Sequence, residues 1–246
     1  MPITYFSHPE NYREKERLYL EVRSREGRVW SDEALKQLPE VKSPAALARE
    51  WRWRKRTFER FDAYLNRHYP NRLIRVLDLG CGNGWMSNLI AGNPLRSVTA
   101  VDLNEMELKQ GRRVFQRDNL QFAFGDVLQG ALPEKNFEVI VLAASVQYFP
   151  DLKELLTALR RLLAANGSIH LLDSHFYATE AERHAAGQRS LTYYQQLGVP
   201  EMGNFYHHHL WKEAQALGAV NLNRRADVYL LQLCGYYGPF PWLVIG

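Results

Sequence analysis

A short apolar segment that ends in a cluster of glycines constrains the fold of this chain more than any other feature. Residues 73–79 are almost continuously apolar, which is typical of a parallel strand buried on both faces of a sheet. Gly80, Gly82 and Gly84 follow, and glycine allows a sharp turn and a close approach of the backbone to a ligand. Because residues 86–91 then favour a helix, the segment predicts a ligand site above the carboxyl end of the strand.

This glycine loop differs from two well-known phosphate-binding loops. The dinucleotide fingerprint requires a small residue three places after its second glycine, and here Trp85 holds that place. A P-loop requires Lys followed by Ser or Thr after the last glycine, and neither is present. Asp78 lies two residues before the first glycine, where a carboxylate disfavours a pyrophosphate and favours a ligand that carries a positive charge.

Further strand patterns follow the glycine loop in order. Apolar segments at 97–103, 120–126, 137–144 and 168–173 predict four more strands, with helical patterns between them. This alternation predicts an α/β fold with a mostly parallel sheet and helices on both of its faces. Asp102 ends the second strand roughly twenty residues after the glycines, where a carboxylate can accept both hydroxyls of a ribose.

The pattern Asp78-x-Gly80-x-Gly82-x-Gly84, with the acids that end the next two strands, resembles the class I S-adenosylmethionine-dependent methyltransferases. The resemblance covers residues 73 to about 233 and implies a Rossmann-like, seven-stranded sheet whose last strand is antiparallel. It also implies S-adenosyl-L-methionine as cofactor and S-adenosyl-L-homocysteine as product. Asp126 would meet the adenine amino group. The residues predicted to bind the cofactor are Asp78, Gly80, Cys81, Gly82, Gly84, Asp102, Leu103, Asp126, Val127 and Ala143.

The chain is expected to consist of an N-terminal extension and a cofactor-binding domain that carries a lid. Residues 1–70 predict an N-terminal helical extension, with helices at 11–26 and 31–38 and a longer one to about residue 68, with Ser43 as its N-cap. Residues 71–246 would form the cofactor-binding domain, with a lid inserted at about 178–205. In that domain a helix is expected from Asp151 to Asn166-Gly167, and a closing antiparallel hairpin from 219–223 and 228–233.

The long N-terminal helix carries an apolar stripe and a basic stripe. The net charge of the chain is only +4, and Glu50, Glu59 and Asp62 lie among the arginines, so the charge pattern is mild for a nucleic-acid-binding protein. Residues 143–151 also lack the Asn/Asp-Pro-Pro-aromatic motif that the family's base N-methyltransferases usually show. RNA is therefore the less favoured partner, and a small molecule the preferred one. The apolar stripe is Leu47, Trp51, Phe58, Phe61 and Leu65, and the basic stripe is Arg49, Arg52, Arg56, Arg60 and Arg67.

The acceptor side is expected where the fourth and fifth strands end. Ser145, Gln147 and Tyr148 follow one strand, and residues 173–177 follow the other. Because imidazole titrates near neutral pH, His175 is the predicted base, with Tyr148 or His208 in reserve. His170 lies inside the strand and is expected in the core. In the lid, Tyr193, Tyr194, Met202 and Phe205 would form an apolar wall over the acceptor, or only the lid's own core.

No metal site is predicted. His207, His208 and His209, if placed on one helix, point in three directions, so they cannot all bind one metal ion. Cys81 and Cys234 form neither a disulfide framework nor a zinc spacing and are expected to be reduced.

Together these patterns predict methyl transfer to a small-molecule acceptor by in-line displacement. Three alternatives remain: an RNA methyltransferase, a non-catalytic cofactor-binding scaffold, and an aminopropyl transferase on the same fold. Neither a run of some eighteen apolar residues nor a signal pattern occurs, so a cytoplasmic protein without a membrane partner is expected. The sequence leaves the oligomeric state open.

Overall fold

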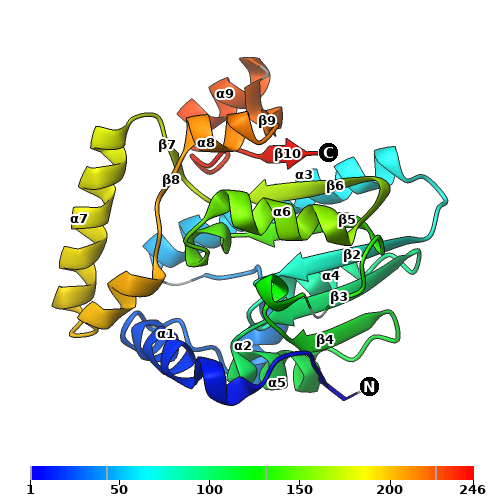
Figure 1. Ribbon diagram of the computed structural model, residues 1–246, viewed down its shortest axis with the longest axis horizontal. Coiled ribbons are helices and arrows are strands. Elements are labelled where there is room, and N and C mark those ends of the chain that lie inside the picture. The colour runs from blue at the N-terminus through cyan, green and yellow to red at the C-terminus, as the bar shows by residue number, and fades with distance from the viewer. Residues whose placement is uncertain (1, 43, 131, 225) are drawn as a thin grey trace.

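The protein, seen here as a computed structural model, is described over residues 2–42, 44–130, 132–224 and 226–246. In this part of the chain an eight-stranded sheet has the order β1-β4-β3-β2-β5-β6-β10-β9 (Figure 1). Strands β1 to β6 pair in parallel, and β10 is antiparallel to both of its neighbours. The strands of this sheet are β1 (Thr4–Tyr5), β2 (Ile74–Leu79), β3 (Arg96–Asp102), β4 (Leu120–Phe124), β5 (Phe137–Ala143), β6 (Leu163–Leu172), β9 (Val220–Asn221) and β10 (Leu243–Ile245).

Helices cover both faces of the sheet and the edge where its parallel strands end (Figure 1). Side-chain caps start several of them, and those of Ser31, Asn104, Asp151 and Thr179 accept hydrogen bonds from the first turn of α2, α5, α6 and α7. The helices are α1 (Arg13–Arg25), α2 (Asp32–Gln37), α3 (Ala45–His68), α4 (Trp85–Ile90), α5 (Glu105–Val114), α6 (Leu152–Leu162), α7 (Glu180–Gln196), α8 (Trp211–Ala216) and α9 (Ala226–Leu233). Short 3-10 turns are η1 (Pro9–Tyr12), η2 (Val127–Gln129), η3 (Val146–Tyr148), η4 (Pro200–Phe205) and η5 (Leu222–Arg224).

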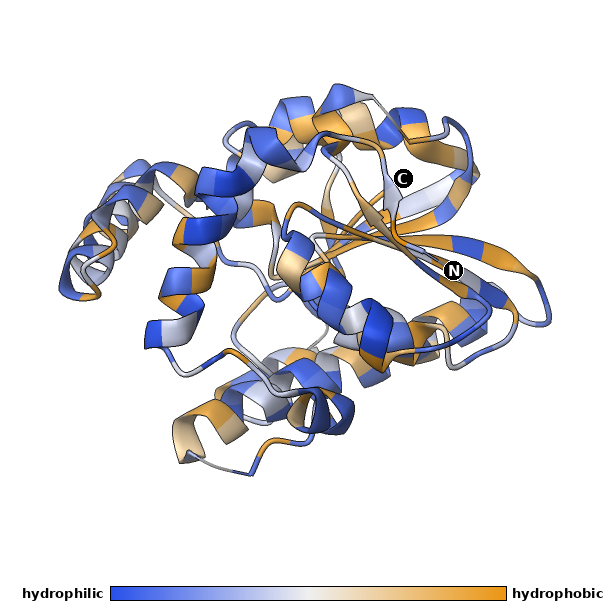
Figure 2. Ribbon diagram, turned by 90° about the horizontal axis from the view of Figure 1, so that it is seen from below, coloured by the Kyte–Doolittle hydropathy of each residue, from blue (hydrophilic) through white to orange (hydrophobic). Residues whose placement is uncertain are grey.

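The core is divided by the sheet into two halves. On one face, α3, α4 and α5 contribute side chains such as Phe61, Ile90 and Leu108, all fully buried. On the other face, α6 and α8 contribute Leu156 and Ala214, also fully buried. Viewed from below, the strands are mostly coloured hydrophobic, and the outer faces of the helices hydrophilic (Figure 2). Truncating a fully buried leucine such as Leu108 or Leu156 to alanine costs about 2–5 kcal/mol of stability. Packing of this strength on both faces keeps the strands, and therefore their carboxyl ends, in fixed positions.

The predicted Rossmann-like α/β class is confirmed, with one strand more than the seven expected. The additional strand is β1, which pairs in parallel with β4 through Thr4↔Ala123 and Tyr5↔Phe124. Two residues are too few to show a strand periodicity, so the sequence carried no signal for it. Because β1 belongs to the sheet and α3 to its core, residues 1–70 are part of the same packed unit; the boundary at residue 70 stays a prediction.

The predicted closing hairpin is wrong in its second half. Residues 228–233 belong to helix α9, and the strand that pairs with both β6 and β9 is β10, with Leu243 opposite Leu171 and Asn221. A short apolar run without alternation fits a helix and a strand equally well, so periodicity could not decide. The predicted end of α6 at Asn166-Gly167 is also wrong, because the chain leaves the helix after Leu162 and pairs with β5 from Leu163 onward.

The N-terminal helix α1 and the insertion after β6 form a common layer over the carboxyl end of the sheet. Leu18 and Val22 of α1 pack against Tyr194, Val199 and Met202 of the insertion. Figure 1 shows α7 standing away from the sheet, with α1 beside its lower end. In the described part of the chain, no helix is both long and apolar enough to cross a membrane.

The histidine run lies at the base of the insertion and is not helical, so its expected helical placement is wrong. His209–Leu210 forms strand β8, which pairs in parallel with β7 (Phe176–Tyr177) in a second, two-stranded sheet. Helix α8 starts only at Trp211. The apolar stripe of α3 packs into the core as predicted, whereas Ser43, its predicted N-cap, lies outside the described residues.

Candidate active site

Two adjoining cavities lie at the carboxyl ends of the parallel strands. We call them the inner cavity, of about 160 Å³, and the outer cavity, of about 960 Å³. The inner cavity is lined by the glycine loop, the ends of β3, β4 and β5, and α1; the outer one is lined by α1, α3, α7 and the segments after β5 and β6. The two share a wall, which consists of Tyr19, Arg23, Arg28, Glu50, Arg54, Ala144, Tyr148 and Met202.

The glycine loop has the conformation and the close contacts that only glycine allows. Gly80, Gly82 and Gly84 all have positive φ, at 73°, 55° and 74°. A Cβ atom at Gly80 would lie 2.4 Å from the Cβ of Ser145, and one at Gly84 would lie 2.5 Å from the Phe122 ring. Gly80, Cys81 and Gly82 line the inner cavity, whereas Gly84 packs beneath it. The loop therefore exposes backbone to this cavity and rests on neighbouring side chains.

Asp102 connects the end of β3 to the glycine loop. Its Oδ2 accepts a hydrogen bond of 2.7 Å from the Gly82 N–H, and its Oδ1 accepts one of 2.8 Å from the Asn104 N–H. Burial raises the pKa of Asp102, and the backbone donors oppose that rise. The carboxylate therefore holds the loop in place and also borders the inner cavity, where it was predicted to lie.

Asp126 also lines the inner cavity, as do Val127 and Leu103, and is held by the N-terminal segment. Its Oδ2 accepts a hydrogen bond of 2.9 Å from the Tyr12 hydroxyl, and its Oδ1 accepts one from the Leu128 N–H. Burial, and then the bond to Asp126, raises the pKa of Tyr12 to about 12. Each carboxylate oxygen has a second lone pair, so Asp126 keeps acceptor capacity for a ligand.

Asp78 does not border either cavity. Its side chain is only 2% exposed, and its Oδ2 accepts a 2.5 Å hydrogen bond from the hydroxyl of Ser87 in α4. Burial raises the pKa of Asp78 to about 7; the bond from Ser87 lowers it and the nearby Asp102 raises it further. Asp78 thus links β2 to α4, and direct contact with a cofactor stays a prediction.

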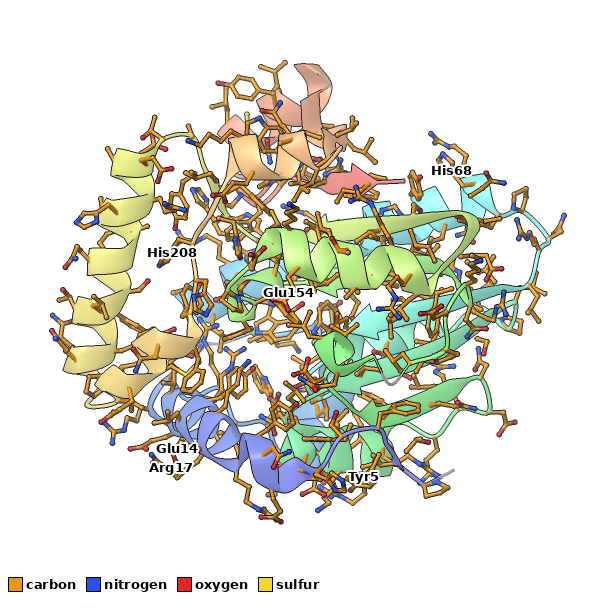
Figure 3. All side chains as sticks on the ribbon, in the orientation of Figure 1. Tyr5, Glu14, Arg17, His68, Glu154 and His208 are labelled. Atoms are coloured by element: carbon orange, nitrogen blue, oxygen red, sulfur yellow. The ribbon has the colours of Figure 1, made fainter. Side chains whose placement is uncertain are left out.

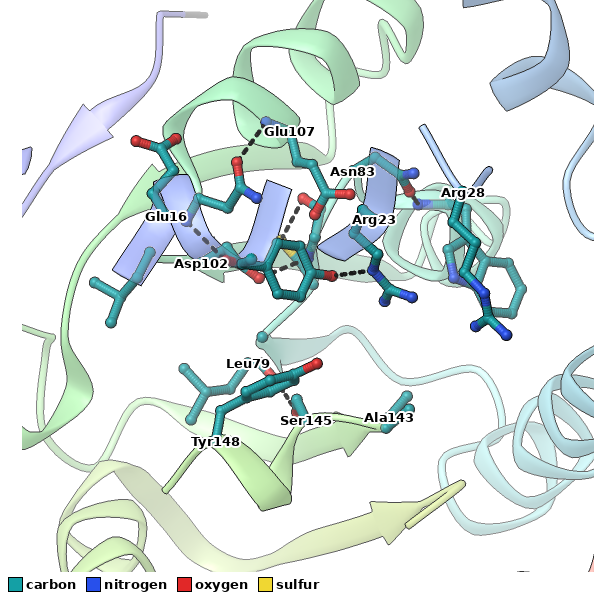
Figure 4. Close-up of a pocket in the computed structure, with 18 of the residues that line it drawn as sticks. Glu16, Arg23, Arg28, Leu79, Asn83, Asp102, Glu107, Ala143, Ser145 and Tyr148 are labelled. Carbon is teal, nitrogen blue, oxygen red and sulfur yellow. Dashed lines mark hydrogen bonds between the residues drawn. The ribbon is translucent and has the colours of Figure 1, made fainter. Parts of the chain in front are cut away.

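Sequence reasoning missed Glu107 of α5 and Asn104, the N-cap of that helix, although both line the inner cavity. Glu107 points into it from the same side as Asp102, opposite Tyr148 and Ser145 (Figure 4). Burial raises the pKa of Glu107 to about 7. Asn104 caps α5 with its Oδ1, but its Nδ2 is buried and has no hydrogen-bond partner among the described residues. The Asn-x-x-Glu spacing signals a helix start, but nothing in it indicates that these groups face a ligand site.

The predicted acceptor residues border the outer cavity. Tyr148 lines both cavities, whereas His175 and His208 line the outer one alone. Gln147, Asp173, Ser174 and Tyr177 also lie there, as do Tyr193, Tyr194 and Met202 of the insertion. Phe205 packs instead in the small core between α1 and the insertion. Ser145 lines only the inner cavity, and its hydroxyl donates to the Leu79 carbonyl.

The histidines differ in their surroundings. Burial lowers the pKa of His175 and of His208, so both imidazoles are neutral at neutral pH. His170 lies in the core as predicted, between the Ser168 hydroxyl and the Trp242 indole, and burial lowers its pKa to about 3. His209 is buried against the Val146 carbonyl. Within the described ranges, no three His, Cys, Asp or Glu side chains converge on a position that could hold a metal ion.

The C-terminal segment covers part of the basic stripe of α3. The guanidinium of Arg56 lies 3.6 Å from the centre of the Tyr236 ring and donates to the Tyr236 carbonyl. Arg60 lies 4.6 Å from the ring centre of Tyr237 and donates to Asn223. The C-terminal segment therefore engages two of the five arginines, and the basic face is smaller than the sequence indicated.

Part of this chain is similar in sequence to known methyltransferases. Residues 76–167 match a family model described as a methyltransferase domain. An uncharacterized methyltransferase of Mycobacterium bovis is 28% identical over 109 residues, which are 44% of this chain and 55% of the relative. A malonyl-[acyl-carrier protein] O-methyltransferase of Bacillus anthracis is 30% identical over 128 residues, or 51% of this chain and 47% of the relative. The chain spans about half the length of these curated relatives.

Solved structures share the fold at low sequence identity. A putative sarcosine dimethylglycine methyltransferase from Galdieria sulphuraria is similar over 85% of this chain and 75% of its own, with a TM-score of 0.58 and 14% identity. At this identity the similarity shows the fold alone.

Proposed function

Because this chain belongs to the class I S-adenosylmethionine-dependent methyltransferase family, we propose that it transfers a methyl group from S-adenosylmethionine to a small molecule. The cofactor would occupy the inner cavity and the acceptor the outer one. The observation that carries this proposal is the wall that the two cavities share, which includes Ala144 and Tyr148. Because both cavities reach these residues, a cofactor in one cavity and an acceptor in the other would meet there, away from bulk water.

The groups around the inner cavity fit the cofactor. Asp102 and Glu107 offer carboxyl oxygens to hydroxyl or ammonium donors, and the unpartnered Nδ2 of Asn104 offers a donor to an oxygen or a ring nitrogen. Gly80 and Gly82 leave space where a side chain would collide with Ser145 or Glu107. Asp102 would hold the ribose, and Asp126 the adenine amino group.

The cofactor supplies a methyl group on a sulfonium, so its transfer needs mainly alignment and exclusion of water. In this chain α1 and the insertion cover the site, and the phenol of Tyr148 lies where the cavities join. Burial raises the pKa of Tyr148, so the phenol stays protonated and orients the acceptor. Where the acceptor must lose a proton, the neutral imidazole of His175 is available in the outer cavity to take it.

A small molecule is supported over RNA by two observations. The outer cavity is bounded by α1, α3 and α7 and has six tyrosines in its lining, and the C-terminal segment occupies Arg56 and Arg60 of the basic stripe. The name of the Bacillus relative, malonyl-[acyl-carrier protein] O-methyltransferase, also points away from nucleic acids. Salt-sensitive binding of RNA to the full chain would reverse this preference.

Calorimetric titration with S-adenosylhomocysteine and S-adenosylmethionine tests the proposal at its first step. Binding of both, followed by methyl transfer in a screen of small-molecule acceptors, is the expected result. A wild-type protein that binds neither compound would overturn the proposal, and the chain would then be a scaffold with a relic glycine loop.

A further inference from the structure

One end of the outer cavity is rich in hydrogen-bond donors and poor in acids. Arg189, on α7, lines this cavity and not the inner one, as do Tyr177, His175 and His208. The guanidinium lies close enough to its neighbours to lower the pKa of His175 and of His208 in addition to the effect of burial. It also counteracts the rise that burial causes in the pKa of Tyr177. The rings of His175 and Tyr177 lie 4.4 Å apart, and those of Tyr177 and His208 lie 5.4 Å apart. We call these three side chains, together with Arg189, the Arg189 cluster.

His208 contributes an unsatisfied polar atom to this cluster. Its Nε2 is buried and has no hydrogen-bond partner in the part of the chain that the structure describes. Its ring packs between Tyr177 and Tyr206, at centroid distances of 5.4 and 5.3 Å. Figure 3 labels His208 between α7 and the ends of the central strands. A buried polar atom without a partner destabilises a fold by about 1–3 kcal/mol, so a ligand that satisfies it gains affinity.

The acids of the outer cavity do not neutralise Arg189. Glu50 pairs with Arg28 and Arg54, and Glu26 pairs with Arg23 and Arg28, all beside the shared wall. The carboxyl group of Asp173 accepts from the Thr57 hydroxyl. Glu182, which acts on the pKa of His175, does not line the cavity, and its carboxylate accepts from the Ala178 N–H. Among the described residues, no carboxylate forms an ion pair with Arg189.

An aromatic path connects the Arg189 cluster to the shared wall. Tyr148, at that wall, contacts Tyr206 at a ring distance of 5.8 Å, and Tyr206 contacts His208 in turn. The ring of Tyr194 also contacts that of Tyr206, at a centroid distance of 6.0 Å. Two ring contacts therefore separate the place where the methyl group would arrive from the cationic end.

We propose that the acceptor carries an oxyanion, a carboxylate or a phosphate monoester, which binds Arg189 and the Nε2 of His208. Its apolar body lies along Tyr206, and its methylated atom lies at Tyr148, so the oxyanion is not the group that is methylated. This inference rests on the proposed function, because that function assigns the acceptor to the outer cavity. A guanidinium and an imidazole N–H bind oxyanions through charge-assisted hydrogen bonds.

The test uses the full chain saturated with S-adenosylhomocysteine and three probes of similar shape: phenylacetate, phenyl phosphate and phenethylamine. Calorimetry should show binding of at least one of the two anions and much weaker binding of the amine. The anion that binds more tightly identifies the carboxylate or the phosphate as the recognised group. Arg189→Gln should weaken anion binding about tenfold or more, and His208→Phe, which keeps a ring but removes Nε2, should weaken it severalfold.

Arg183→Gln is the matched control, because Arg183 lies on the same helix but pairs with Glu180 and Glu213 outside the cavity. It should bind the anions as the wild type does. Anion affinity unchanged in Arg189→Gln, or an amine that binds as tightly as the anions, would overturn the inference. Binding of S-adenosylhomocysteine without any anion binding refutes this inference alone, whereas failure of the wild type to bind S-adenosylhomocysteine refutes the proposed function.

Discussion

Gly80 and Ser145 approach each other so closely that Gly80 has no room for a Cβ atom. A Cβ at Gly80 would lie 2.4 Å from the Cβ and 2.8 Å from the Oγ of Ser145. The Ser145 hydroxyl in turn donates a 2.8 Å hydrogen bond to the Leu79 carbonyl. The ends of β2 and β5 are therefore joined at the floor of the inner cavity, and the glycine loop depends on this contact.

We expect Gly80→Ala to disrupt cofactor binding and to destabilise the protein more than Gly130→Ala. Both glycines have φ near +70°, so both variants suffer the left-handed strain of about 1–2 kcal/mol, but a Cβ at Gly130 meets no atom within 4 Å. Overpacking at Gly80 adds about 1–3 kcal/mol. Urea denaturation and calorimetry with S-adenosylhomocysteine measure the two effects. Adding Ser145→Gly to Gly80→Ala should restore part of the stability; no recovery would show that the collision is not the cause.

Asp102→Asn is expected to weaken S-adenosylhomocysteine binding by about tenfold or more, since a charged acceptor is lost at the ribose position and at the Gly82 N–H. The amide keeps the size of the side chain, so the fold should survive. Asp118→Asn, at an exposed position, serves as the control. Isothermal calorimetry gives both dissociation constants. Equal affinities in the two variants would remove Asp102 from the cofactor site.

Asp78→Asn should stabilise the protein increasingly as the pH rises. The pKa of Asp78 is about 7 in the fold, against 3.8 in a free carboxyl group, so its burial cost is absent below about pH 4. That cost grows between pH 4 and 7 and reaches up to about 4 kcal/mol above pH 7. Asn keeps an acceptor for Ser87. The difference in free energy of unfolding between variant and wild type, measured in urea, should therefore be larger at pH 8 than at pH 5 by about 2 kcal/mol or more. An equal difference at the two pH values would contradict the raised pKa.

His175→Ala should abolish methyl transfer to an identified acceptor while leaving S-adenosylhomocysteine affinity within about twofold. His175 lines only the outer cavity, so the cofactor site does not contain it. The variant removes a neutral imidazole that can act as a base, an effect typically of about 10²–10⁴-fold in rate. Unchanged turnover would show that His175 is not the base.

Much of the fold and part of the candidate site followed from local sequence alone. The strands that end near Asp78, Asp102 and Asp126 have apolar patterns and spacings that specify a parallel sheet, and caps such as Asp151 mark where helices begin. The conformation of the glycine loop is equally local, because positive φ at Gly80, Gly82 and Gly84 is a property of the residues themselves.

Tertiary structure alone decided the features that depend on contacts between distant segments. The place beside β6 is taken by residues 243–245, which form strand β10, whereas the apolar residues 228–233 form a helix. Glu107 faces the inner cavity, Tyr12 reaches Asp126, and the C-terminal segment covers Arg56, none of which a periodicity can encode. Each of these contacts joins residues that are far apart in the chain, whereas a sequence pattern relates only residues within a few turns of one another. The same applies to the Arg189 cluster, since α7, β7 and the segment before β8 meet only in the folded chain.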